Sequence, residues 1–153
     1  MSDPAIRSEG NLRFAGEPCL GYPIDVEGRV RRIREALTAQ ADVKDYGPAT
    51  VLFTLPPHGE ANTWEGQVGV SITGLPQPIG EIRAEDYHDL RACWVAHQGP
   101  TRDLAATHGR LVERARSQGF IVRPYWRVQL WRRRLADGSP LPVCEVSVFL
   151  ERF

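Results

Sequence analysis

The clearest strand pattern in the chain is Val143-Cys144-Glu145-Val146-Ser147-Val148-Phe149-Leu150. Successive side chains of a strand point to opposite faces, so this stretch separates into two sets. The first set is uniformly apolar and is expected to pack against a helix. The second set places one carboxylate and one aromatic ring on the opposite face. The members of the first set are Cys144, Val146, Val148 and Leu150, and those of the second are Val143, Glu145, Ser147 and Phe149.

The elements before this strand follow the same order in both halves of the chain. In the second half, residues 89–97 predict a strand, Thr101 can cap a helix that runs to about residue 118, and residues 125–131 predict another strand. In the first half, residues 12–18 are extended and Asp25 can cap a helix through about residue 41. Two strands are then expected at residues 49–55 and 67–72. Each half therefore reads strand-helix-strand-strand.

This repetition predicts an α+β fold of duplicated β-α-β-β units related by a pseudo-two-fold. The units are expected at about residues 11–75 and 86–151, within one domain over residues 11–153. One unit alone would carry an antiparallel sheet with a helix on one face and nothing on the other. Two units can bury their open faces against each other, which leaves a ligand cleft between two sheets. Residues 1–10 are expected to form a flexible N-terminal tail.

The side chains expected to face this cleft join aromatic rings to one acid. A carboxylate there loses hydration, which raises its pKa unless a cation or hydrogen-bond donors compensate. Arg127 on the neighbouring strand can supply the cation, and so can an organic ligand, to which aromatic rings add cation–π attraction. In the alternative reading, Glu145 is a surface residue on an edge strand, paired with Arg127, and Trp94 packs on a helix. The candidate ligand-binding residues are Glu145, Trp131, Tyr125, Trp94, Phe149 and Gln67, the last of which occupies in unit one the position of Glu145 in unit two.

Composition and charge exclude several classes of protein. Lys and Arg total 19, as do Asp and Glu, so the chain lacks the basic excess of a dedicated nucleic-acid binder. No apolar run approaches the roughly 20 residues of a membrane span. The three cysteines have no metal-ligand spacing, which favours buried free thiols in a reducing compartment, and the N-terminus is unlike a secretory signal. We expect a cytoplasmic protein with no cofactor or metal, and no direct binding to nucleic acid or membrane.

Three short stretches of the sequence resemble the GyrI-like small-molecule-binding family, which also forms the effector-binding domain of bacterial multidrug-responsive regulators. They are residues 64–70 (WEGQVGV), 91–100 (RACWVAHQGP) and 144–148 (CEVSV). The resemblance implies a pseudo-two-fold pair of units whose cleft binds bulky, often cationic aromatic compounds, with Glu145 as the cleft glutamate. The sequence departs from the family pattern at Gln67, where an acidic residue is frequent, and in the absence of proline at the end of the last strand.

Two functions follow from this resemblance. The first is a stand-alone small-molecule-binding protein, of the multidrug or effector type, for bulky aromatic cations. The second is a hydrolase that detoxifies cyclopropane-bearing alkylating compounds, with Glu145 and Trp131 as catalytic residues. A third reading is a protein-interaction module that inhibits a larger target, and the sequence leaves a protein partner or a homodimer unspecified. Only about ten residues precede the first expected strand, so no DNA-reading domain is expected.

Overall fold

The computed structural model describes residues 3–97, 99–138 and 140–152, which form strands and helices in the order β-α-β-β, β-α-β-β. This is the order that the sequence predicts, and it makes the protein an α+β fold. Short 3₁₀ turns at Ala61–Thr63 and Thr101–Asp103 lie between them. The elements are β1 (Ala5–Leu20), α1 (Val26–Thr38), β2 (Lys44–Phe53), β3 (Glu65–Thr73), β4 (Arg83–His97), α2 (Leu104–Ser117), β5 (Phe120–Arg134) and β6 (Pro140–Arg152).

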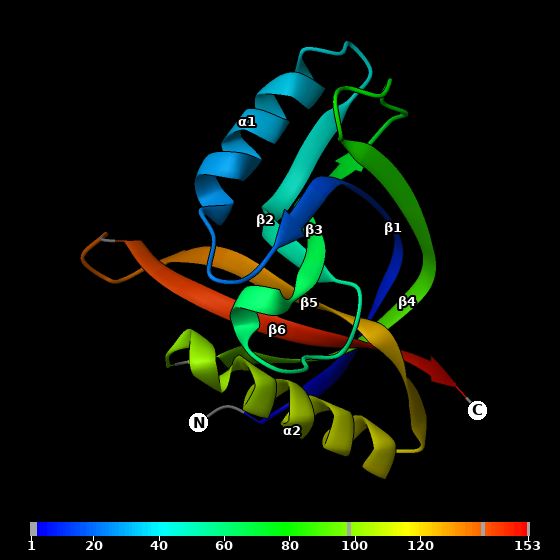
Figure 1. Ribbon diagram of the computed structural model, residues 1–153, viewed down its shortest axis with the longest axis vertical. Helices are drawn as coiled ribbons and strands as arrows, with labels where there is room; N and C mark the ends of the chain where they lie inside the picture. The colour runs from blue at the N-terminus through cyan, green and yellow to red at the C-terminus, as the bar shows by residue number, and fades with distance from the viewer. Residues whose placement is uncertain (1–2, 98, 139, 153) are drawn as a thin grey trace.

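The strands close into one antiparallel barrel, in the circular order β1-β3-β2-β5-β6-β4 (Figure 1). The predicted pair of separate sheets across a cleft is wrong, because β2 pairs with β5 and β1 with β4, which joins the halves along both edges. Closure gives every strand of the barrel two neighbours over part of its length. If β1, β2 and β3 trade places with β4, β5 and β6, respectively, the same pairs of strands remain neighbours in the barrel. A duplication requires this symmetry, and the duplicated units at 11–75 and 86–151 stay a prediction.

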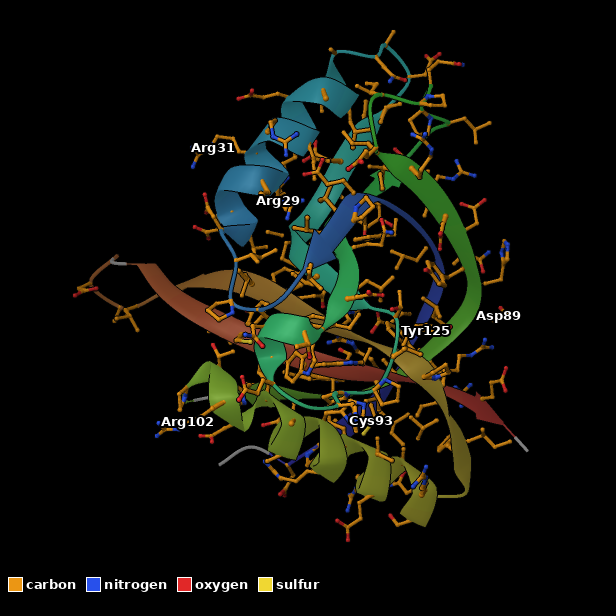
Figure 2. All side chains as sticks on the ribbon, viewed as in Figure 1. Arg29, Arg31, Asp89, Cys93, Arg102 and Tyr125 are labelled. Atoms are coloured by element: carbon orange, nitrogen blue, oxygen red, sulfur yellow. The ribbon has the colours of Figure 1, made fainter. Side chains whose placement is uncertain are left out.

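The main hydrophobic core lies between the outside of the barrel and the two helices. Its strand residues are the apolar sets that alternation predicts, including Val68, Val70 and Ile72 of β3 and Val146, Val148 and Leu150 of β6. Helix α1 lies against β2 and β3, and α2 lies across β4, β5 and β6 (Figure 1). In Figure 2, Cys93 lies beside α2, whereas Arg29 and Arg31 extend from α1. The inward face of the barrel is thereby left to the other set of side chains.

Helix α1 begins after Asp25, as predicted. The Asp25 carboxylate accepts a hydrogen bond from the Gly28 N–H at 3.0 Å, which satisfies one of the N–H groups that a helix start leaves free. Ile33 and Leu37 are fully buried against the barrel, and such burial contributes about 2 kcal/mol for each side chain. On β1, the buried carboxylate of Glu17 accepts hydrogen bonds from arginines of α1, which fixes the helix to the strand.

Helix α2 begins later than the sequence predicts. Thr101 was expected to cap it, but Thr101–Asp103 form a 3₁₀ turn and the α-helix starts at Leu104, with no side-chain cap. The predicted end is close to the observed one, because the helix stops at Ser117. Gly119 follows with φ +84°, a conformation that glycine adopts without steric cost.

The N-terminal residues are the main correction to the predicted domain limits. Ala5–Leu20 form β1, whose first part pairs with β4 from Ala5 opposite Trp94 to Ser8 opposite Arg91. The expected flexible tail is therefore wrong for residues 5–10, and residues 1–2 lie outside the described part of the chain. The strand has the composition of a solvated tail because its inward-facing positions carry the charged residues Arg7 and Glu9. This segment supplies two residues of the site described below.

The three cysteines are free thiols. Cys19 and Cys93 are buried, as expected, and Cys144 is half-buried. Burial raises the pKa of Cys19 and Cys93, and it raises the pKa of Cys144 to about 11. All three thiols are therefore protonated at neutral pH. Among the residues that the structure describes, no helix has the length and apolar character needed to cross a membrane.

Candidate functional site

The inside of the barrel combines buried charges with aromatic rings. Alternation along each strand sends one set of side chains outward to the helices and the other set inward. The inward set includes a small apolar cluster of its own, made of Phe14, Leu52, Leu90, Ala92 and Phe149. Two arginines and two glutamates stand beside this cluster: Arg7, Glu9, Arg127 and Glu145.

Arg127 and Glu9 form the buried centre of this charged group. Arg127 Nη1 lies 2.6 Å from Glu9 Oε1, and Arg127 Nη2 lies 2.6 Å from Glu9 Oε2, a bidentate pair between β5 and β1. Arg127 Nη2 also lies 3.1 Å from the Ser147 hydroxyl, and the guanidinium carbon lies 5.0 Å from the centre of the Phe149 ring. With a side-chain exposure of 4%, Arg127 depends on these partners for its solvation.

Arg7 extends the group to Glu145. Its Nη2 donates a hydrogen bond to Glu145 Oε1, and its Nε lies 3.2 Å from Glu9 Oε2. The guanidinium carbon lies 4.5 Å from the centre of the Trp94 ring, within cation–π range. The four charges thus form a chain, Glu145–Arg7–Glu9–Arg127, with equal numbers of positive and negative groups.

The ionisation of Glu9 reflects this arrangement. Burial acts to raise its pKa, but the hydrogen bonds and charges of Arg127 and Arg7 outweigh burial, so that the pKa of Glu9 is lowered. Glu9 is therefore a carboxylate at neutral pH. Burial raises the pKa of Tyr87 and Tyr125, so both phenols carry their protons.

The rings of Tyr125, Phe149 and Tyr87 form an aromatic wall next to Arg127. The Tyr125 ring centre lies 5.1 Å from that of Phe149 and 5.6 Å from that of Tyr87. These rings enclose a cavity of ≈ 10 Å³, about the space of one water molecule. Side chains therefore fill most of the interior, and a larger molecule requires them to move. The cavity is lined by Leu12, Phe14, Thr50, Leu52, Ser71, Tyr87, Leu90, Tyr125, Arg127, Gln129 and Phe149.

Two buried polar atoms in the interior have no hydrogen-bond partner among the described residues. They are Gln129 Oε1, an acceptor, and Arg127 Nε, a donor. Both residues line the cavity and lie two positions apart on the same face of β5. Buried polar groups are usually hydrogen-bonded, because an unpaired group costs about 1–3 kcal/mol. The interior therefore offers one free donor and one free acceptor to an incoming polar group.

The structure places four of the six predicted ligand residues in the charged group, in contact with it, or in the cavity lining. Glu145 is buried and faces inward, so the alternative reading of an exposed edge residue is wrong. Tyr125 and Phe149 line the cavity, and Trp94 lies under Arg7. The expected cation is different, because Glu145 pairs with Arg7 and not with Arg127. In the β5–β6 register, Arg127 lies opposite Ser147 and Gln129 lies opposite Glu145, which places Arg127 one inward position away.

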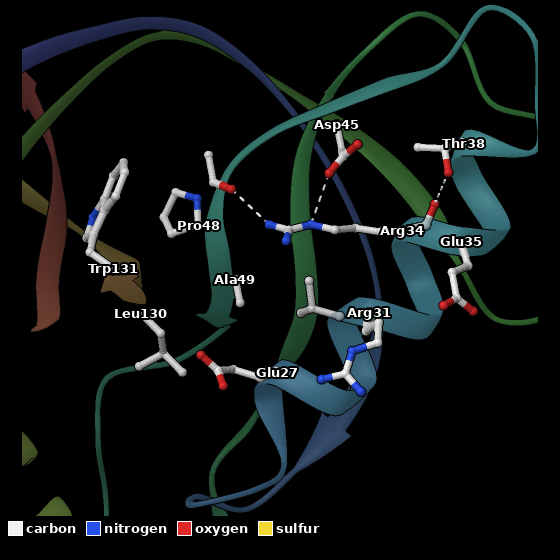
Figure 3. Close-up of a pocket in the computed structure, with 12 residues that line it drawn as sticks. Glu27, Arg31, Arg34, Glu35, Thr38, Asp45, Pro48, Ala49, Leu130 and Trp131 are labelled. Atoms are coloured by element: carbon white, nitrogen blue, oxygen red, sulfur yellow. Dashed lines mark hydrogen bonds and ion pairs between the residues drawn. The ribbon is translucent and has the colours of Figure 1, made fainter. Parts of the chain in front are cut away.

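Trp131 and Gln67 lie outside the cavity lining. Trp131 shares the face of Gln129 and Arg127 on β5, but it lies beyond the point where β2 pairs with β5, and 38% of its surface is exposed. It lines an open groove of ≈ 670 Å³ between α1 and the ends of β2 and β5 (Figure 3). Within this groove Arg34 of α1 is held by Asp45 at 3.0 Å and by the Gly47 carbonyl at 2.9 Å. Gln67 is half-buried on the inward face of β3, which it shares with its partner Leu52, but it is not part of the cavity lining.

Sequence reasoning missed three residues of the site: Arg7, Glu9 and Tyr87. Side-chain alternation could have indicated Arg7 and Glu9, because they share a face with Ala5. The neighbouring Ile6 points to the other face and packs on the main core. The pairing partners, however, lie more than a hundred positions later in the chain. Tyr87 precedes residues 89–97, where the strand was expected, whereas β4 begins at Arg83.

The fold and the interior together define the class: a six-stranded α+β barrel with two outer helices and a charged, aromatic interior. No protein-family model matches the chain, and no curated protein matches it. Solved structures do match. The chain is similar to the crystal structure of the EcmrR C-terminal domain, with a TM-score of 0.72, 12% identity, and coverage of 99% of this chain and 98% of that one.

Three further structures extend this comparison. EcmrR bound to DNA gives a TM-score of 0.74 at 13% identity, and the match covers 99% of this chain and 58% of that one. A hydrolase from Listeria innocua gives 0.59 at 8%, with coverage of 97% and 92%. A protein from Staphylococcus aureus, described as a putative bacterial transcription regulation protein, gives 0.55 at 9%, with 99% of both chains covered. At these identities the likeness is one of fold.

Proposed function

We propose that the protein is a small-molecule-binding domain of the effector-binding type, with the barrel interior as its ligand site. The observation that carries the proposal is the buried group of four charges beside an aromatic wall. Burying an ion costs several kcal/mol, and a hydrophobic core of similar volume is often as stable or more stable. Four charges in the interior therefore support a binding role. The similarity to the EcmrR domain supports the same class.

The composition of the interior favours an aromatic ligand that carries one positive charge. Tyr125, Phe149 and Tyr87 offer flat apolar surface, and Glu145 with Trp94 offers a carboxylate next to an aromatic face. The interior is nearly filled, so binding has to displace side chains. Arg7 is suited to this because 34% of its side chain is exposed.

The proposal is tested with a planar cationic dye, ethidium, and the fluorescence of the tryptophans. Trp94 and Glu145 both contact Arg7, so a dye that binds at Glu145 is expected to quench the emission of Trp94. Glu145→Gln is expected to weaken binding by about 5- to 150-fold, the loss of a charge-assisted contact of about 1–3 kcal/mol. Glu35→Gln, on α1 beside the outer groove, is the matched control and should leave the affinity unchanged. Equal affinity for the wild type and the Glu145 variant would refute the proposal, and a loss confined to the Glu35 variant would place the dye in the groove.

A hydrolase is the second candidate. The structure favours it through the two interior carboxylates, Glu9 and Glu145, and through the similarity in fold to the Listeria innocua hydrolase. A carboxylate near a bound compound can act as a general base toward water. Of the two predicted catalytic residues, Glu145 lies in the interior, whereas Trp131 lines the outer groove. Incubation with a cyclopropane-bearing alkylator and mass spectrometry for the ring-opened product separates the two candidates, because binding without product favours the first.

A further inference from the structure

Arg7 makes the contacts that a bound guanidinium ligand would make. One N–H points to the Glu145 carboxylate, a second lies 3.2 Å from a Glu9 oxygen, and the plane covers the Trp94 ring at 4.5 Å. Two carboxylates at the edge and an aromatic face below form a binding site for a planar cation. The occupant of this site is a side chain of the protein itself.

The two arginines of the interior differ in how firmly they are held. Arg127 is buried and forms two contacts of 2.6 Å with Glu9, besides its contact with Ser147. Arg7 is one-third exposed, so that part of its side chain already faces solvent, and exchange requires it to turn outward. Glu9 keeps its bond to Arg127 when this happens. Glu145 would then be a buried carboxylate without its cation, which is costly unless another cation replaces Arg7.

The strand segment that carries Arg7 is attached along one side only. Residues Ala5–Ser8 pair with β4, whereas the pairing of β1 with β3 begins at Phe14. The β1–β4 register shifts between Ser8 and Gly10, and Gly10 has φ +65°. The part of β1 that carries Arg7 is therefore held by backbone hydrogen bonds to one neighbouring strand, β4.

We propose that Arg7 is an internal ligand of the interior site, and that the site selects monocations of the guanidinium or amidinium class by exchange with it. This inference rests on the proposed function. Exchange of Arg7 for one external cation preserves the balance of two positive and two negative charges, whereas an anion does not. A planar cation with N–H groups can also replace the hydrogen bonds to Glu145 and Glu9. A quaternary ammonium ion has no N–H to donate, so it restores the charge without those bonds.

The test removes the internal ligand and supplies its head group in solution. Ethylguanidinium, which matches the end of the arginine side chain, is expected to bind Arg7→Ala with a millimolar Kd and to raise its melting temperature. It should bind the wild type at least ten-fold more weakly, and tetramethylammonium should bind neither protein. The double variant Arg7→Ala/Glu145→Gln should lose the response. Arg13→Ala, which removes an arginine of an exposed ion pair on the same strand, is the control for general effects of the cation.

Several results would overturn the inference. One is that ethylguanidinium does not bind Arg7→Ala. Another is that tetramethylammonium binds Arg7→Ala as tightly as ethylguanidinium does. If Arg7→Ala does not fold, Arg7→Met keeps the side-chain volume and is tested in the same way, and failure of both variants to respond also overturns it. The proposed function is judged separately with ethidium. If ethidium binds the wild type and Arg7→Ala with equal affinity, the role of Arg7 as an internal ligand is contradicted and the proposed function is not. If ethylguanidinium binds Arg7→Ala but ethidium binds neither protein, the proposed aromatic ligand is contradicted and the role of Arg7 is not.

Discussion

Arg127 on β5 holds both carboxylate oxygens of Glu9 on β1, each at 2.6 Å, across the inside of the barrel. This ion pair joins the first strand to a strand of the second half. Removing one partner leaves the other as a buried unpaired charge, which is costlier than the pair itself is favourable. The pair is therefore a sensitive point of the structure for mutation.

Glu9→Ala is expected to destabilise the protein by about 3–5 kcal/mol, because Arg127 then lacks its counter-ion. Urea unfolding followed by far-UV circular dichroism measures the change. Asp86→Ala breaks the exposed Arg13–Asp86 pair and serves as the control, with a much smaller effect. The double variant Glu9→Leu/Arg127→Met should recover most of the loss, since it removes both charges together. Equal effects of Glu9→Ala and Asp86→Ala would contradict the structural role of the pair.

His108 on α2 makes stability depend on pH. Burial lowers its pKa to about 4, whereas an unfolded histidine has a pKa of about 6.5. The unfolded state therefore takes up a proton first as pH falls, so stability is highest above pH 6.5 and declines until about pH 4. The total loss from this group is at most about 3 kcal/mol.

His108→Phe is expected to remove this part of the pH dependence while it keeps the aromatic contact with Trp126, whose ring centre lies 5.1 Å away. Unfolding free energies of both proteins at several pH values between 4 and 7.5 test the expectation. The wild type should lose more stability than the variant over that window. Parallel curves would show that His108 does not titrate with a lowered pKa.

Two glycine-to-alanine substitutions should have opposite signs. A Cβ atom on Gly69 of β3 would lie 1.9 Å from the Ala15 carbonyl oxygen, so β1 and β3 have to separate, at a cost of about 1–3 kcal/mol or more. A Cβ on Gly109 of α2 meets nothing within 4 Å, and alanine favours the helix by about 0.5–1 kcal/mol. Melting temperatures should therefore fall for Gly69→Ala and rise for Gly109→Ala. A rise in both would contradict the close approach of β1 to β3.

Trp131 is expected to account for most of the tryptophan emission that iodide can quench. Its ring is exposed in the outer groove, whereas Trp126 and Trp64 are buried. Trp131→Phe should lower the quenchable fraction without a change in stability, since the side chain contributes little to the core. Trp64→Phe is the control and should leave the quenchable fraction unchanged. Loss of quenching in the control only would place Trp131 in the interior instead.

Alternation predicted the faces of β5 and β6 correctly because both faces of these strands are used. Val146 and Val148 pack outward, and Glu145 and Ser147 face inward, as expected. The closure of the barrel could not be predicted in this way, since side-chain pattern does not reveal which strand edges pair. For the same reason Trp131 was assigned to the site: it has the correct face, but it lies past the end of the barrel wall.

The residues that were hardest to predict are those whose ion-pair partners lie far away in the chain. Arg127 was expected to balance Glu145 because the two lie on neighbouring strands. In the folded protein Glu145 takes Arg7, and Arg127 takes Glu9. Inward-facing charges at positions 7 and 9 make the start of β1 look like a solvated tail, so the segment that completes the site gave no apolar pattern.

The sequence separations of these pairs, 118 positions for Glu9–Arg127 and 138 for Arg7–Glu145, have a consequence during synthesis. The ribosome makes Glu9 long before Arg127, and contacts this remote in the chain slow folding because a large loop must close first. Arg7 and Glu9 stay hydrated until β5 and β6, which carry their partners, have emerged. A nascent chain arrested before β5 can therefore form α1 and the β1–β3 pairing, but it cannot enclose the interior of the barrel.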